Sequence, residues 1–171
     1  AKPKRTILFI GFAGEEFGLL GAQAWVKAHK DKLPKIANLF NRDGGPEPPV
    51  GISVPQAMYD DFVKISEPIQ KIRPDYPFEV KVREPRKRPT RMGGTDASVF
   101  AIEGVPTLGF TTEDFKGYDF DYGEIWHTER DLYTKNIPEY QEHTATVTAI
   151  IALGVANLDK QLSREGLYTE E

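Results

Sequence analysis

Apolar residues along this chain occur in short runs that alternate with helical patterns. Ile7 to Ile10 form a continuous apolar run that leads into Gly11 and Gly14, and residues 19–26 then place apolar side chains at helical spacing. A short apolar run bounded by glycine is typical of a buried strand, whereas an apolar stripe at helical spacing is typical of an amphipathic helix. The start of the chain therefore predicts a buried strand, a turn and a helix.

The same alternation continues to the C-terminal end. Glycine, proline and charge separate the later apolar segments, as they do at turns and helix ends. The pattern predicts a strand over Ile36 to Phe40, an irregular proline-rich loop through Pro49 and a helix over 55–72. It then predicts a half-buried strand through Phe78, Val80 and Val82, and a short helix with an N-cap at Thr95 that ends at Gly104. The last part of the chain predicts a strand over Val105 to Phe110, a polar loop over 111–126 and a long helix from Pro138 to about Leu162.

Strands that alternate with helices predict an α/β fold. We expect a mostly parallel or mixed sheet between helices, in a three-layer αβα arrangement, with residues 1–171 forming one domain or the C-terminal part of one. Ligands of such sheets bind beyond the carboxyl ends of the strands. Polar candidates fall at those ends in order: Glu15 and Glu16, then Asp43, then Asp96, then His127.

Composition narrows the function classes. The formal net charge is −4, so the chain lacks the positive field that draws proteins to nucleic acid. The sequence has no cysteine, which excludes a disulfide framework, a cysteine-ligated zinc and a thiol nucleophile. No apolar run reaches the ~18 residues that a membrane span needs. These features leave a soluble enzyme or binding module as the expectation.

The carboxylates and His127 have the chemistry of a hydrolytic zinc site. Such a site needs oxygen and nitrogen ligands together with one free carboxylate that takes a proton from water. Glu15 and Glu16 would face opposite ways in a strand, but Gly11 and Gly14 allow a turn there. In the alternative interpretation, the two glutamates are favourable charges in the first turn of a helix.

Four ordered segments, namely the stretch 5–21 and those around Asp43, Asp96 and His127, resemble peptidase family 28, the co-catalytic zinc exopeptidases of clan MH. The stretch 5–21, RTILFIGFAGEEFGLLG, is similar to the family's strand, Glu-Glu and Gly-Leu-Leu-Gly signature. The other three segments are Asn41-Arg42-Asp43-Gly44, Gly94-Thr95-Asp96 with Gly104-Val105-Pro106, and Trp126-His127-Thr128-Glu129-Arg130-Asp131. The resemblance covers nearly the whole chain.

The resemblance implies a role for each matched residue. Glu15 would be the general base, and Glu16, Asp43 and His127 would be metal ligands for two zinc ions in the complete domain. Asp96 and Asp131 would support the site or contact substrate, with Asp131 orienting the imidazole. The family's His-x-Asp motif and bridging Asp have no counterpart here, so we expect a C-terminal portion of the domain that holds zinc partly or not at all and is inactive alone.

The implied function is a metal-dependent exopeptidase, most simply an aminopeptidase, acting on peptides. Zinc would lower the pKa of a bound water to about 7, and Glu15 would pass its proton to the leaving amine. The resemblance favours an extracytoplasmic location, either secreted or periplasmic. Two alternatives stay open: a single-zinc acyltransferase similar to glutaminyl cyclase, and a non-catalytic binding module, against which the retention of all matched residues argues.

Several further residues have two interpretations each. His29 suits the negative end of the first helix, and His143 suits the surface or interior of the last one. Tyr122 and Trp126 could line a substrate pocket or pack in a core. A basic run over 81–91 could be solvated or could recognise a substrate carboxylate. An uncovered sheet edge or face could also pair copies into a homo-oligomer.

Overall fold

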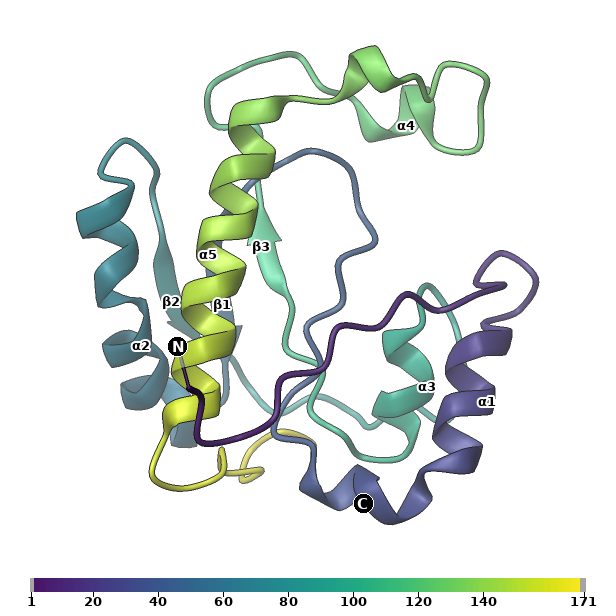
Figure 1. The fold of residues 1–171 in the computed structure, drawn as a ribbon, viewed down its shortest axis with the longest axis vertical. Coiled ribbons are helices and arrows are strands. Elements are labelled where there is room, and N and C mark those ends of the chain that lie inside the picture. The colour runs from purple at the N-terminus through teal and green to yellow at the C-terminus, as the bar shows by residue number, and fades with distance from the viewer. Residues whose placement is uncertain (1, 170–171) are drawn as a thin grey trace.

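The computed structural model describes residues 2–169, and it confirms the α/β class with a mixed sheet (Figure 1). The elements in chain order are α1 (Leu20–Ala28), η1 (Lys30–Lys35), β1 (Pro49–Val54), η2 (Gln56–Met58), α2 (Tyr59–Ile72), β2 (Glu79–Val82), α3 (Ala97–Ile102), β3 (Phe110–Thr112), α4 (Tyr122–Ile125), η3 (Tyr133–Lys135) and α5 (Pro138–Asn157), where η marks a 3₁₀ helix.

The sheet has three strands in the order β2-β1-β3. β1 pairs with β2 in parallel, with Ile52 opposite Val80, and with β3 in antiparallel fashion, with Ile52 opposite Phe110. Gly51 is needed at the centre, because a Cβ there would lie 2.5 Å from the carbonyl oxygen of Glu79 on β2. Any side chain at this position would push the two strands apart.

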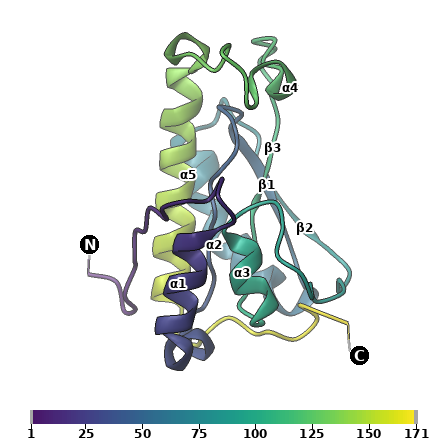
Figure 2. The same cartoon turned by 90° about the vertical axis from the view of Figure 1, so that its right-hand side faces the viewer.

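The main core lies between the sheet and the helices α2 and α5, which run along the same face of it (Figure 2). Ile52 of β1, Phe62 of α2 and Ile151 of α5 are almost completely buried there. A second core joins α1 and α3 around Val26 and Phe100. Among residues 2–169, no helix combines the length and the apolar character that crossing a bilayer requires.

Several expected elements are confirmed. α2 lies within the expected range 55–72, and β2 covers the alternating residues up to Val82. α5 begins at Pro138, as expected, but it ends at Asn157 instead of near Leu162. α3 stops before Gly104, which has a φ of 78°. Thr95 is not its N-cap, since the helix begins at Ala97 and the capping position is Asp96.

The predicted buried strand over Ile7 to Ile10 is wrong in this structure. The segment is extended but is assigned to no strand, and Leu8 and Phe9 are 64% and 92% exposed. Its backbone is fixed outside the apolar run, where the Arg5 N–H donates to Ala156 O and the Gly21 N–H donates to Ala13 O. A strand needs a partner along its edge, and no neighbouring strand lies there among residues 2–169.

The segments 36–40 and 105–109 are also extended, but they do not form a regular β-ladder with each other. The Leu39 N–H donates to Pro106 O, but proline has no N–H to return. The side chain of Asn38 takes the place of backbone pairing. Its Oδ1 accepts the Leu108 N–H at 2.8 Å, and its Nδ2 donates to Leu108 O at 3.2 Å. The predicted strand over Ile36 to Phe40 is therefore wrong as a strand, and the one over Val105 to Phe110 begins only at Phe110.

The structure also places regular elements in two predicted loops. Pro49 starts β1, as proline can at the first residue of a strand, so the proline-rich loop ends before it. The predicted polar loop over 111–126 contains the end of β3 and the short helix α4. Asp121 caps α4 by accepting a hydrogen bond from the Gly123 N–H at 2.8 Å.

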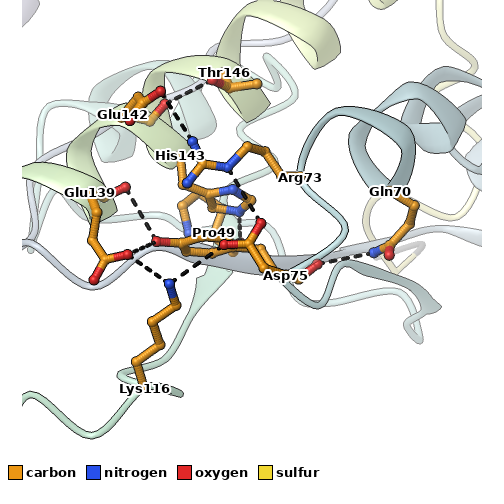
Figure 3. Close-up of polar contacts among 10 residues, drawn as sticks. Pro49, Gln70, Arg73, Asp75, Lys116, Glu139, Glu142, His143 and Thr146 are labelled. Carbon is orange, nitrogen blue, oxygen red and sulfur yellow. Dashed lines mark hydrogen bonds and ion pairs between the residues drawn. The ribbon is translucent and has the colours of Figure 1, made fainter.

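His143 is fully buried, which confirms the packing interpretation. Its ring stacks on Tyr76 with centroids 3.9 Å apart. Its Nε2 donates to Pro49 O at 3.0 Å (Figure 3). The Nδ1 atom has no partner in the described part of the chain. Burial lowers the pKa of His143; the Pro49 carbonyl and Asp75 oppose that shift, while the cations of Arg73 and Lys116 add to it.

We expect the folded protein to lose stability as pH falls from 7.5 to 5.5. The unfolded chain binds a proton at His143 near pH 6.5, whereas the folded chain binds it only at lower pH, so acid favours unfolding in this window. Thermal unfolding across this range measures the effect. His143→Gln keeps a donor for Pro49 and does not titrate, so its pH dependence should be flatter; an equally steep dependence would contradict the assignment.

Candidate active site

Glu15 and Glu16 lie in a tight turn ahead of α1. Gly14 has a φ of 69°, in the left-handed region that favours glycine, and the N–H groups of Gly18 and Leu19 donate to Glu15 O at 3.0 and 2.8 Å. The expected turn is confirmed, although the extended segment before it is not a strand. Because α1 begins at Leu20, the two glutamates are not charges of its first helical turn.

His127 is carried by a long excursion, residues 113–137, which we call the arm. The arm lies beyond the N-terminal end of α5 and contains α4 (Figure 1). His127 has a φ of 56°, a conformation that residues with a Cβ seldom adopt. Its Nε2 lies 2.9 Å from Oε1 of Glu16, so residues 111 positions apart in sequence meet here.

The remaining carboxylates act on Glu15 electrostatically. The pKa of Glu15 is raised by desolvation and then by the negative charges of Asp43, Glu16 and Asp96, while His127 opposes the shift. Burial and Asp43 likewise raise the pKa of Asp96. Asp96 is 8% exposed, and its Oδ1 has no described partner. The predicted site residues other than Asp131 thus lie close enough for their charges to interact.

A broad open hollow of about 1780 Å³ joins these residues. Glu15, Glu16, Asp43, His127 and Asp131 all line it, whereas Asp96 is buried and does not. Another part of the lining is a face of α5 made largely of small residues, which recur at helical spacing but were not predicted as part of the site: Thr144, Ala145, Thr148, Ala149 and Ala152.

Aromatic side chains of the arm form another part of the hollow. Tyr122 and Trp126 both line it and are 43% and 56% exposed, so they are not packed in a core. The two rings stack at an interplanar angle of 22°, and Trp126 also stacks on the ring of His127 at 4.5 Å. An exposed apolar wall therefore stands beside the imidazole.

The donor chemistry at this site fits zinc better than the geometry does. Glutamate, aspartate and imidazole are suitable ligands, and Glu16 and His127 are within hydrogen-bonding distance of each other. Within residues 2–169, however, no three His, Cys, Asp or Glu side chains converge closely enough to enclose an ion. Asp131 lines the hollow but makes no hydrogen bond to His127 in the described structure.

The basic run over 81–91 does not line the hollow. Arg83 donates to the carbonyl of Leu167, and Arg88 donates to that of Ile102, so both guanidinium groups hold main-chain segments. The described cations in the wall are instead Arg42 and Lys135. Arg42 is committed to the carbonyls of Gly45 and Glu47. Recognition of a substrate carboxylate by the basic run is not supported.

Comparisons with known proteins agree with this arrangement. Carboxypeptidase Q from Mus musculus is 24% identical over 168 residues, which are 95% of this chain and 32% of the relative. A probable zinc metalloprotease from Pyrenophora tritici-repentis is 50% identical over 42 residues, covering 25% of this chain and 10% of the relative. The crystal structure of a peptidase M28 precursor from Shewanella amazonensis SB2B aligns with a TM-score of 0.71 at 26% identity, covering 95% of this chain and 34% of that one.

The chain thus spans about a third of the length of carboxypeptidase Q and of the Shewanella amazonensis chain. The sequence profile described as Peptidase family M28 matches residues 1–151, a range that holds all of the candidate site residues. The ordered motifs, the fold and this match agree, and the chain belongs to peptidase family M28.

Proposed function

We propose that this chain contributes the general base and part of the metal centre to a zinc-dependent exopeptidase. The observation that carries the proposal is the approach of Glu16 to His127 at 2.9 Å, with Glu15 next to this pair and facing the same hollow. Metal ligands with an adjacent free carboxylate are the groups that hydrolysis by activated water uses. The family membership supports the same function.

Glu16 and His127 would hold one ion and Asp43 a second, and the ions would polarise the scissile carbonyl and make water more acidic. Glu15 stays free of the metal in this assignment. Its carboxylate accepts a proton from the attacking water and then delivers it to the departing amine. Desolvation and then the neighbouring carboxylates raise the pKa of Glu15, which makes it a stronger base than a solvated glutamate.

The arm offers a subsite for the side chain of the substrate. Tyr122 and Trp126 present a stacked aromatic surface to the hollow directly beside His127. An aromatic wall gains free energy from burying apolar side chains and little from charged ones. We therefore propose peptides with an apolar or aromatic terminal residue as substrates, and aminopeptidase activity outside the cytoplasm as the direction and location.

The 171-residue chain by itself should bind zinc weakly and lack peptidase activity. The described residues bring only two donors into contact, so water would have to complete each ion's coordination. The exposed apolar segment with Leu8 and Phe9 also favours association of copies, which would cover it. We propose both the weak zinc binding without activity and the association of copies.

Metal removal tests the proposal on the protein at its natural full length. We expect release of single terminal amino acids from peptides such as Leu- or Phe-initiated tetrapeptides, loss of that activity with 1,10-phenanthroline, and recovery with added zinc. An N-acetylated peptide should resist cleavage if the enzyme is an aminopeptidase. Chelator-insensitive cleavage, or cyclisation of N-terminal glutamine in place of cleavage, would contradict the proposal.

A further inference from the structure

The arm that carries His127 has almost no core of its own. Of its 25 residues, 113–137, only Ile125 is buried. Most of the others, including His127 itself, are exposed. A segment with so little buried apolar surface cannot fix its own position, because packing supplies most of the free energy that orders a chain. Its orientation must come from contacts with the rest of the chain, which include the packing of Phe120 and Tyr122 against Gly45 and a denser set at its base.

The base of the arm is held by a polar cluster at the first turn of α5, which we call the anchor: Tyr76, Asp114, Lys116, Glu139 and Tyr140. The ammonium group of Lys116 lies 2.6 Å from Glu139 and 3.5 Å from Asp75, and 4.5 Å from the centre of the Tyr76 ring (Figure 3). Tyr76 and Tyr140 are buried, so these contacts form against rings that core packing holds in place.

The anchor also fixes the backbone where the arm begins. The Tyr140 hydroxyl donates to Asp114 at 2.5 Å, and the same hydroxyl oxygen accepts the Lys116 N–H at 3.0 Å. Asp114 in turn accepts the N–H groups of Tyr118 and Phe120 at 3.1 and 3.4 Å. One carboxylate and one hydroxyl thereby set the direction in which residues 114–120 leave the body.

The charges of the anchor reinforce each other. The hydrogen bond with Glu139 raises the pKa of Lys116, and Lys116 lowers the pKa of Glu139, so both groups stay ionised over a wide pH range. Burial and Asp114 raise the pKa of Tyr140 to about 12, which keeps its hydroxyl protonated and able to donate. Such a cluster holds its geometry where an isolated surface ion pair would not.

We propose that Lys116 and its partner Glu139 are positioning residues, which hold the arm so that His127 reaches Glu16 across the hollow. The significance of that position for zinc rests on the proposed function, whereas the mechanical role of the anchor does not. Supporting groups outside the ligand set typically change metal affinity by about 10–100-fold.

Hydrogen exchange with mass spectrometry on the full-length protein tests the mechanical role, and zinc titration tests its consequence. In Lys116→Met we expect exchange over 118–132 to rise by about tenfold while peptides of β1 and α2 keep their wild-type rates. Zinc affinity should fall by about tenfold or more. Lys116→Arg should restore most of both, because it keeps the charge.

The matched control is Lys4→Met, which removes an ion pair of the same 2.6 Å length, to Asp159, remote from the arm. It should change neither measurement. Unchanged exchange over 118–132 in Lys116→Met would overturn the proposal, and so would equal acceleration throughout the protein. If Lys116→Met does not fold, Tyr140→Phe takes its place, with the same two outcomes. A wild-type protein that binds no zinc would refute the proposed function, while the exchange result would still decide on the anchor.

Discussion

Glu15→Gln should abolish turnover while leaving the zinc content of the full-length protein nearly unchanged. Glutamine has almost the same shape as glutamate but cannot accept the proton from water, and a positioned general base contributes about 10²–10⁴-fold to the rate. Steady-state kinetics and elemental analysis of the purified variant measure the two quantities separately.

Glu129→Gln is the matched control, since Glu129 is an exposed carboxylate of the same arm as His127 and does not line the hollow. It should keep both activity and zinc. If Glu15→Gln instead loses one equivalent of zinc, Glu15 is a ligand and the roles of Glu15 and Glu16 are exchanged.

The second large effect is expected for His127→Ala. Removal of the imidazole takes away one partner of the Glu16 pair and one nitrogen donor, so zinc affinity at one site should fall by well over tenfold and activity should fall with it. A competitive titration with a zinc chelator of known affinity resolves the two sites.

His29→Ala is the appropriate comparison. His29 lies at the C-terminal end of α1, where its ring stacks on Trp25 and bonds the Trp25 carbonyl, and it does not line the hollow. Its loss should affect neither zinc nor activity. His143→Ala is less suitable, because removing a fully buried ring would also destabilise the fold. Equal losses of zinc in the His127 and His29 variants would refute the ligand assignment.

The sequence predicted helices well because their patterns are local. The helices α2 and α5 each bury one face, and the apolar residues of that face recur at helical spacing in the sequence. The strands were harder, because pairing depends on partners elsewhere in the chain. Val50, Ile52 and Val54 alternate with smaller residues and could have indicated β1, but the preceding prolines suggested a loop.

The failure at Ile7 to Ile10 has a different cause. The composition of that segment suits a buried strand, yet burial requires neighbours that residues 2–169 do not provide. The candidate site was accessible from sequence for another reason: its residues follow extended segments, and the topology brings the ends of those segments to one hollow. The anchor was not accessible, because nothing in the spacing of Tyr76, Lys116 and Glu139 indicates that they meet.

The contact between Glu16 and His127 also bears on the order of folding. It closes a loop of 111 residues, whereas the anchor contact between Lys116 and Glu139, 23 positions apart, closes a much shorter one. Long loops lose more entropy on closure and form later than local contacts. We therefore expect the contact between Lys116 and Glu139 to form before the two sides of the hollow meet, so that a partly folded chain contains the anchor region before it contains the pair of donors.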